Sequence, residues 1–537
     1  MPASSFPGRT VFMNASRALV ALLLGLVLSG CASLPGNVER TASTAVTNTG
    51  DTRLGKDVRT RTAAHPGKSG IHPLLIAEDA FAARIVLART AERSLDLQYY
   101  IWHADTTGQL LWAAIWEAAE RGVRVRLLLD DANTGGLDPT LAALDAHPNI
   151  EVRLFNPFPN RGFRAGDFAT DFARVNRRMH NKSFTADNQV TIVGGRNVGD
   201  EYYGANMDVG FQDLDVMGIG PVVHEVSDEF DLYWNCASAY PAASIIAPSK
   251  AASTATLRAG WEQVRQKNEA EHYLEAVRQT PLLAQIANDD LRFEWTTAKV
   301  VHDDPAKIQE STDRTDLQLL PVLEEAFGKP KRELDLVSPY FVPGVNGTKT
   351  LVTLAQSGIK VRVLTNSLAA TDVSPVHAGY SKYRMELLRG GVMLYELKPG
   401  SAVPPPGRDD DEDHRRGLPG SGSGGSSAAS LHAKTFGVDR ERIFVGSYNL
   451  DPRSARLNTE MGVIIDGPEL AGGLARQFET NIPNKAYLVR LGPDGQGIEW
   501  IDTEATGQTT LTTEPGAGAG KRMWIDILEI LPIEWLL

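Results

Sequence analysis

The chain has 537 residues, of which 42% are apolar and 22% are charged, so it is long enough to form two to four domains with sizeable cores. Its formal net charge is −12 at pH 7. An acidic chain lacks the broad basic surface of nucleic-acid-binding proteins, so the composition argues against that class without excluding a local basic patch.

The first 30 residues are expected to be a signal peptide rather than part of the fold. Arg9 and Arg17 lead into the apolar stretch 18–27, which is too short for a comfortable membrane span. Residues 28–31 (Leu-Ser-Gly-Cys) resemble a bacterial lipobox. The resemblance implies cleavage before Cys31 and attachment of lipid to this cysteine; an uncleaved anchor helix is the alternative. Cleavage would remove two arginines and no acid, leaving a net charge of about −14 (52 − 66).

The residues after Cys31 bear on location. Ala32 stands where an aspartate would be the usual signal for retention in the inner membrane, so an outer-membrane anchor with the body in the periplasm is expected. Cys236 is the only other cysteine, so no intrachain disulfide is expected. Residues 31–70 are polar and poor in apolar side chains, which predicts a flexible tether.

An internal repeat begins after the tether. A strand, a helix and a second strand occur in each half, at 95–100, 110–119 and 123–129, and again at 334–340, 350–356 and 359–364. Gly122 and Gly358 end the two helices. The pattern predicts an α/β fold of two duplicated domains, each a mixed, mostly parallel sheet flanked by helices. The predicted divisions are a first domain at 71–250, a helical connection at 251–320, a second domain at 321–485 and a C-terminal extension at 486–537.

Each half also carries one copy of the motif H-x-K-x4-D-x6-G-[GS]-x-N, at an offset of 252 (432 − 180). The copies comprise His180, Lys182, Asp187 and Asn197, and His432, Lys434, Asp439 and Asn449. A single H-x-K-x4-D is a weak signal, whereas two copies in register indicate a functional pair. The repeat before the motifs has an offset of only 236 (358 − 122), so the second half carries a net insertion of 16 (252 − 236).

Part of this insertion is the segment 400–430, which contains a proline run, an acidic run and a glycine- and serine-rich run. Such a composition predicts disorder. The segment ends directly before His432, and a tolerated surface insertion is favoured over a mobile lid.

The last residues, 521–537, are rich in Trp, Leu and Ile but too short and too charged to span a membrane. They are expected either to lie in a membrane interface or to dock on the protein's own surface.

The residue types of the two motifs suit phosphodiester chemistry. A neutral imidazole is a nucleophile near neutral pH, and a second imidazolium can protonate the leaving oxygen. Alternation along a strand places each histidine on the same face as the lysine two residues later. The lysines are expected to hold the charged phosphoryl oxygens, with Asn197 and Asn449 as further phosphate-binding donors.

The paired motifs resemble those of the phospholipase D superfamily. The resemblance implies two phospholipase D-like domains packed around one shared active site, a covalent phosphohistidine intermediate, and no metal or other cofactor. It implies His180 as the nucleophile and His432 as the general acid, with the two roles exchangeable by symmetry.

The resemblance also assigns acids to the site. Asp187 and Asp439 complete the catalytic motifs, and a folding role is favoured over a chemical one for both. A different acid orients each histidine in this superfamily, and the matching positions are Glu460 and, by register, Asp213.

Within the superfamily, the closest resemblance is to bacterial cardiolipin synthases of the C type, over roughly residues 72–537. It is carried by 178–184, 193–197, 446–454 and 531–537. It implies a phosphatidyltransferase that makes cardiolipin from phosphatidylglycerol and a second phospholipid such as phosphatidylethanolamine. The lipobox and the 400–430 insertion depart from the family pattern, which puts the acceptor lipid in doubt.

Three other functions remain as alternatives: a phospholipase D that releases phosphatidic acid, a metal-independent nuclease, and a non-catalytic envelope lipoprotein. The expected partners are phospholipid substrates and a membrane, not nucleic acid. The oligomeric state stays open, because one chain already supplies both half-sites.

Overall fold

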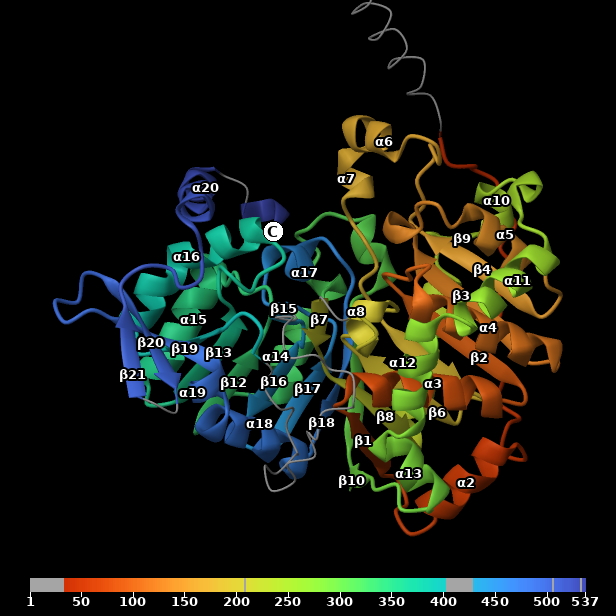
Figure 1. Ribbon diagram of the computed structural model, residues 1–537, viewed down its shortest axis with the longest axis horizontal. Coiled ribbons are helices and arrows are strands. Elements are labelled where there is room, and N and C mark those ends of the chain that lie inside the picture. Colours follow the sequence, from red (N-terminus) through yellow and green to blue (C-terminus); the bar gives the residue numbers. More distant parts are fainter. Residues whose placement is uncertain (1–32, 207–208, 402–427, 505–506, 532–533) are drawn as a thin grey trace, which may run out of the picture.

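The computed structural model describes residues 33–206, 209–401, 428–504, 507–531 and 534–537. The predicted signal peptide, Cys31 and most of the predicted insertion at 400–430 therefore lie outside the described residues. The described residues form two large sheets, which lie in two halves side by side and are covered by helices, and one small two-stranded sheet (Figure 1).

The first sheet has nine strands. In spatial order they are β10 (Glu294–Thr296), β1 (Ser69–Leu74), β8 (Asp215–Ile219), β6 (Val190–Gly194), β5 (Ser183–Ala186), β2 (Ser94–Tyr99), β3 (Arg124–Asp130), β4 (Ile150–Phe155) and β9 (Ala239–Pro241). The helices of this half and of the connection are α2 (Arg53–Thr62), α3 (Ala77–Thr90), α4 (Thr106–Glu120), α5 (Asp138–Asp145), α6 (Arg164–Thr170), α7 (Phe172–Val175), α8 (Asp200–Tyr203), α9 (Pro221–Trp234), α10 (Ala242–Ile245), α11 (Thr254–Arg265), α12 (Asn268–Arg278) and α13 (Pro281–Ala287).

The second sheet has ten strands. In spatial order they are β11 (Ala298–His302), β18 (Met461–Ile465), β17 (Arg442–Gly446), β16 (Thr435–Val438), β12 (Glu333–Val337), β13 (Lys360–Asn366), β14 (Met393–Leu397), β19 (Ala486–Leu491), β20 (Ile498–Glu504) and β21 (Gly507–Leu511). Its helices are α14 (Leu319–Phe327), α15 (Gly344–Gln356), α16 (Ser374–Arg389), α17 (Pro452–Arg456), α18 (Pro468–Thr480), α19 (Ile482–Lys485) and α20 (Ala519–Ile530). The order β8-β6-β5-β2-β3-β4 recurs as β18-β17-β16-β12-β13-β14, which is the predicted duplication.

The helix α4 shows how the sequence builds one unit of the repeat. The Asp105 side chain caps its first turn by accepting a hydrogen bond from the Gly108 backbone N–H at 3.0 Å. The helix is buried on almost all sides, between β3 and the helices α3, α8 and α11, and its apolar side chains include Leu111, Trp112 and Ile115. The chain then turns at Gly122, whose φ of +94° favours glycine.

The sheets are mixed, but the predicted mostly parallel pairing is wrong. Only β2–β3–β4 and β12–β13–β14 are parallel within the two large sheets, and the other neighbours pair antiparallel. The reason lies in the motifs themselves, because H-x-K-x4-D-x6-G folds as a β-hairpin. Asp187 and Asn188 turn the first hairpin with φ of 51° and 50°, and Asp439 and Arg440 turn the second with φ of 56° and 60°. Two consecutive left-handed residues make a tight hairpin turn, which forces the flanking strands antiparallel.

The flexible tether predicted for 31–70 is wrong from Arg40 onward. The Arg40 guanidinium donates to the carbonyl of Ala239 at 3.0 Å. The buried Arg153 and Arg126 of the first sheet donate to the carbonyls of Thr41 and Ser43 at 2.6 and 2.9 Å. The segment then forms α2 and begins β1. Low apolar content did not reveal this packing, because it depends on backbone carbonyls that satisfy buried arginines.

Two predicted boundaries also shift. The connection 251–320 is helical through α13, but β10 then joins the first sheet and β11 joins the second. The extension expected from 486 begins with β19, β20 and β21, which continue the second sheet. Of the described helices, none is both long and apolar enough to cross a membrane.

The C-terminal tail docks on the second half. The helix α20 buries Ile525 and Leu528 against α16, and the Lys521 ammonium donates to the carbonyl of Leu368 at 2.6 Å. The terminal Leu537 is buried beside Val342. Of the two positions expected from the sequence, the tail therefore adopts the one on the protein's own surface.

Candidate active site

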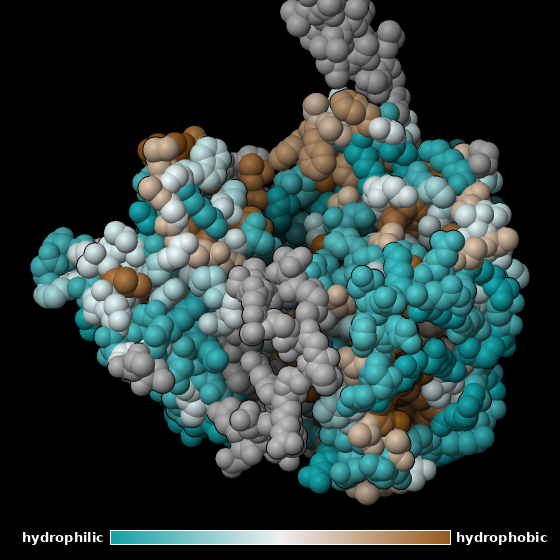
Figure 2. All heavy atoms as spheres, in the orientation of Figure 1, coloured by the Kyte–Doolittle hydropathy of each residue, from teal (hydrophilic) through white to brown (hydrophobic). Residues whose placement is uncertain are grey.

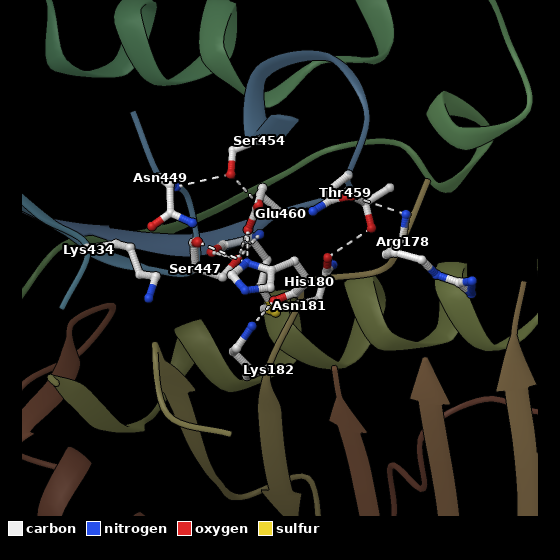
Figure 3. Close-up of polar contacts among 12 residues, drawn as sticks. Arg178, His180, Asn181, Lys182, Lys434, Ser447, Asn449, Ser454, Thr459 and Glu460 are labelled. Carbon is white, nitrogen blue, oxygen red and sulfur yellow. Dashed lines mark hydrogen bonds and ion pairs between the residues drawn. The ribbon is translucent and has the colours of Figure 1, made fainter. Parts of the chain in front are cut away.

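The two motif histidines are held where the halves meet, and each is fixed by the backbone of the opposite half. The His180 N–H donates to the carbonyl of Thr459 at 2.8 Å, directly before Glu460 (Figure 3). The His432 N–H donates to the carbonyl of Gln212 at 2.8 Å, directly before Asp213. The strands β7 (Val209–Gln212) and β15 (Ala428–Leu431) pair in parallel and carry the second junction.

Glu460 holds the His180 ring. Its Oε2 lies 2.8 Å from Nδ1 of His180, and the carboxylate also accepts the hydroxyls of Ser447 at 2.5 Å and Ser454 at 2.6 Å. The backbone N–H of Glu460 donates to the buried Asp303 at 2.8 Å. A carboxylate at Nδ1 fixes the tautomer with the hydrogen on Nδ1, which leaves the Nε2 lone pair free.

Asp213 holds the His432 ring in the same way, with 2.5 Å between Oδ2 and Nδ1. The Lys434 ammonium lies 2.9 Å from the same Nδ1. Nδ1 carries one hydrogen, and it donates this hydrogen to the Asp213 carboxylate, which is the nearer of the two groups. Lys434 therefore acts on the ring as a neighbouring positive charge. The structure confirms both predicted acids and shows which histidine each one holds: each half contributes one histidine and the acid that orients the other.

The two lysines are buried beside their histidines. Lys182 and Lys434 each donate to the backbone carbonyl of the histidine two residues earlier, and they come from the two halves to lie around the His180 ring (Figure 3). Burial lowers the pKa of Lys182 well below its ordinary value and that of Lys434 to about 8. An anionic phosphate placed between them would favour the charged form of both.

Burial also keeps the histidines neutral. It lowers the pKa of His180 to about 4, against the opposing effect of Glu460. It lowers the pKa of His432 as well, with Lys434 acting in the same direction. Burial opposes ionisation of Glu460, yet His180 and Lys182 hold the pKa of that carboxyl below its ordinary value. At neutral pH the site therefore pairs neutral imidazoles with carboxylates, which is the state in which a histidine is nucleophilic.

The side-chain amides of the two motif asparagines differ in the hydrogen bonds that they already make. The Asn197 side chain accepts from the Ile101 N–H at 3.1 Å and donates to the Tyr202 hydroxyl at 3.0 Å, so only one of its N–H groups is left for a ligand. Asn449 is buried at the site, and its Oδ1 has no hydrogen-bond partner within the described part of the chain. The unpaired Oδ1 can only accept, so a phosphoryl oxygen would have to be bound by the side-chain N–H groups of Asn449.

Asp187 and Asp439 lie outside the site, so their prediction as catalytic residues is wrong and the favoured folding role is the one observed. The Asp187 carboxylate accepts the backbone N–H groups of 92, 93 and 94 at 2.7–3.1 Å, at the start of β2. Asp439 does the same for 331, 332 and 333 at the start of β12. Each aspartate sits in a hairpin turn and ties it to the start of the neighbouring strand, which is a folding role.

Sequence reasoning gave no role to the two serines that hold Glu460. The sequence feature that could have revealed Ser447 is the [GS] position of the motif, which is glycine in the first half and serine in the second. Ser447 donates its hydroxyl to Glu460, whereas the equivalent Gly195 leaves room for the shorter acid. A Cβ on Gly195 would lie only 2.1 Å from Oδ1 of Asp213. In the second half a serine donates to the longer acid, Glu460. In the first half a glycine, which has no side chain, leaves space for the carboxylate of Asp213.

Aromatic rings line the site around both histidines. Tyr100 meets the His180 ring edge-on at 5.0 Å between centroids, and Tyr202 meets the His432 ring at 5.3 Å. Phe211 stacks on the His432 ring at 5.0 Å. These rings limit the rotation of the imidazoles and keep water from them.

Comparisons with known proteins bear on this site. A family model described as "Cardiolipin synthase, PLD-like domain" matches residues 85–234 and 323–482. "Cardiolipin synthase C" of Escherichia coli (strain K12) is 45% identical over 90% of this chain and 100% of its own length. An "Uncharacterized protein" of Helicobacter pylori (strain ATCC 700392 / 26695) is 31% identical over 77% of this chain and 80% of its own length. The crystal structure of phosphatidylserine synthase from Haemophilus influenzae Rd KW20 superposes with a TM-score of 0.51 at 14% identity, over 90% of this chain and 99% of that one, which is a likeness of fold alone.

Proposed function

The chain belongs to the cardiolipin synthase family with phospholipase D-like domains, and from this premise we propose that it is a phosphatidyltransferase that makes cardiolipin. The observation that carries the proposal is the crossed arrangement of His180 with Glu460 and His432 with Asp213, beside two buried lysines. One chain thereby supplies a nucleophile, an acid and two phosphate-binding cations in one place. Similarity to cardiolipin synthase C over 90% of the chain supports the lipid substrate.

The first step transfers the phosphatidyl group to the protein. Nε2 of His180 attacks the phosphorus of a donor phospholipid, an N–P bond forms, and the P–O bond to the headgroup alcohol breaks. His432 must be protonated on Nε2 for this step; the charge of the bound phosphate favours that imidazolium, which gives its Nε2 proton to the departing oxygen. Lys182 and Lys434 stabilise the charge on the phosphoryl oxygens. Glu460 stabilises the positive charge that His180 acquires.

The second step transfers the phosphatidyl group to the acceptor. His432 takes the proton from a glycerol hydroxyl of phosphatidylglycerol, whose oxygen attacks the phosphorus while the N–P bond breaks. The products are cardiolipin and the freed headgroup alcohol: glycerol from phosphatidylglycerol, or ethanolamine from phosphatidylethanolamine. Water in place of the lipid hydroxyl would give phosphatidic acid, so the same site serves the hydrolytic alternative.

A product assay tests the proposal. Purified protein is incubated with phosphatidylglycerol, with and without phosphatidylethanolamine, and the lipids are analysed by mass spectrometry. Cardiolipin that forms with the wild type and is absent with His180→Ala and His432→Ala supports the transferase. Phosphatidic acid alone would favour the hydrolase, and metal-independent cleavage of DNA would favour the nuclease.

The site residues and their roles are part of the same proposal, and so is the location of the protein. The chain is proposed to be lipidated at Cys31 and to face the periplasm, with the outer membrane favoured over the inner one. The lipobox-like residues 28–31 and Ala32 support this location. Fractionation of cells that express wild type or Cys31→Ser tests it. Lipidated protein should float with outer membranes and carry acyl groups on its N-terminal peptide, and recovery of both proteins in the same fraction would contradict it.

A further inference from the structure

The helix α20 has two apolar faces, and docking on the protein uses only one of them. Ile525 and Leu528 are buried against the second half. On the opposite side, Met523, Trp524, Ile527, Ile530 and Leu531 are exposed, with Ile530 at 83%. Burying the exposed side chains of a helix in an apolar environment is favourable, and leaving them in water is not. We therefore expect a partner to cover the second face of α20.

A second apolar group lies on α6 and α7. Phe163, Phe168 and Phe172 are 52%, 43% and 40% exposed. Together with the four exposed residues of α20 and Leu531 directly after it, they account for 8 of the 12 exposed large apolar side chains of the described chain. Isolated exposed apolar residues are ordinary, but a concentration in two short segments marks an interaction surface. We call these eight residues the apolar rim.

The two parts of the apolar rim border the same site. The helix α7 ends at Val175, and the chain reaches His180 five residues later. Arg453 joins the parts: its guanidinium donates to the carbonyl and side-chain oxygen of Asn176 at 3.0 Å each, and to the carbonyl of Leu536 at 2.6 Å. The next residue, Ser454, donates to Glu460 of the active site. Figure 2 shows two apolar patches, over α20 and over α6 and α7, on either side of a hollow between the halves.

We propose that the apolar rim docks on the surface of a phospholipid bilayer, so that lipid headgroups enter the site between α7 and α20 while their acyl chains stay in the membrane. This inference rests on the proposed function, because a phospholipid is the substrate that must reach the site. Tryptophan and phenylalanine beside polar groups suit the headgroup level of a bilayer. Asp526 is exposed at the edge of the α20 face, which limits the depth of insertion to that level.

The start of the described chain agrees with this orientation. Residues from Ser33 lie at the same edge of the molecule as α6, α7 and α20 in Figure 1. Cys31, the proposed lipid attachment point, precedes them by two residues. A lipid anchor and the apolar rim would then hold the same face of the protein against one membrane.

The test is vesicle binding by the mature full chain with Cys31→Ser, which removes the anchor. Two double variants, Trp524→Ser/Ile530→Ser and Phe168→Ser/Phe172→Ser, alter the two parts of the rim. Leu232→Ser/Val322→Ser is the matched control, because these side chains are similarly exposed (41% and 38%) on other elements. Co-flotation with vesicles of phosphatidylglycerol and phosphatidylethanolamine should fall at least about tenfold for each rim variant and not for the control.

Activity separates the docking surface from the chemistry. On vesicles, the rim variants should need about tenfold more lipid for half-maximal rate, whereas their rate on soluble short-chain phosphatidylglycerol should equal that of the wild type. Wild-type binding by both rim variants, an equal loss by the control, or a dimer that only the rim variants dissociate would overturn the proposal. If rim-dependent binding occurs but no cardiolipin forms on either substrate, the proposed function fails and the docking surface stands.

Discussion

Replacing Glu460 by glutamine should remove most of the activity while preserving the fold. Glu460 is fully buried and accepts three hydrogen bonds, from His180, Ser447 and Ser454. The amide keeps the shape, and the serine hydroxyls can rotate to accept its N–H. What is lost is the negative charge next to a ring that becomes positive when the N–P bond forms.

The size of the loss follows from the burial. Removing one partner of a buried ion pair costs about 3–5 kcal/mol. At 1.36 kcal/mol for each factor of ten, kcat/KM should fall by roughly 10² to 5 × 10³. The assay is the initial rate of cardiolipin formation from phosphatidylglycerol in mixed micelles.

Asp187→Asn provides the matched control, since it makes the same chemical change at a buried motif acid outside the site. It should lower thermal stability but leave kcat/KM within about threefold when the assay is run below the melting temperature. The reasoning is refuted if Glu460→Gln stays within tenfold of the wild type. It is equally refuted if folded Asp187→Asn loses as much activity as Glu460→Gln.

Three further predictions concern pH, packing and stability. Since the pKa of His180 is about 4, kcat/KM should rise as pH increases through about 4, where His180 loses its proton. It should fall at higher pH as His432 loses the proton that it gives to the leaving oxygen and as Lys434, with a pKa of about 8, loses its charge; a wild-type profile that stays flat from pH 5 to 10 would contradict the assignment. Gly195→Ser should cost at least about tenfold in rate, because the new Cβ would meet the Asp213 carboxylate at 2.1 Å; kinetics equal to the wild type would show that the carboxylate has room to move. Asp439→Ala should destabilise the protein by about 1–3 kcal/mol in urea unfolding at pH 7. The backbone N–H groups of 331–333 hold the pKa of Asp439 below its ordinary value against the effect of burial, so its stabilisation is present above pH ~4 and is lost at lower pH; a difference between wild type and variant that persists at pH 2.5 would argue against this origin.

The family, the duplicated fold and the enzyme class could be predicted from the sequence, because two motif copies at a constant offset leave few alternatives. Glu460 and Asp213 could be named as well, from the resemblance to the superfamily and, for Asp213, from the register of the repeat. The structure shows what register alone did not, namely that each acid reaches the histidine of the other half. That crossing depends on how the halves pack, and no local pattern encodes it.

Other features depend on interactions that a hydropathy pattern does not record. The stretch from Arg40 to α2 is polar, yet its carbonyls are bound by Arg126 and Arg153. The antiparallel hairpins of the motifs were signalled by Asp187-Asn188, a pair that tolerates left-handed conformations, but the strand–helix–strand repeat dominated the prediction. In the tail, one sequence stretch carries two apolar faces, so docking and exposure occur together on α20.

The most direct test of the central claim is to trap and chase the covalent intermediate. Protein that turns over phosphatidylglycerol with labelled acyl chains is quenched in denaturant at mildly alkaline pH, where both phosphohistidine and the acyl esters survive, and its peptides are analysed by mass spectrometry. The account predicts one phosphatidyl group, on His180, and its transfer into cardiolipin when unlabelled phosphatidylglycerol is added before the quench. A label on neither histidine, or a chase that yields only phosphatidic acid, would contradict it.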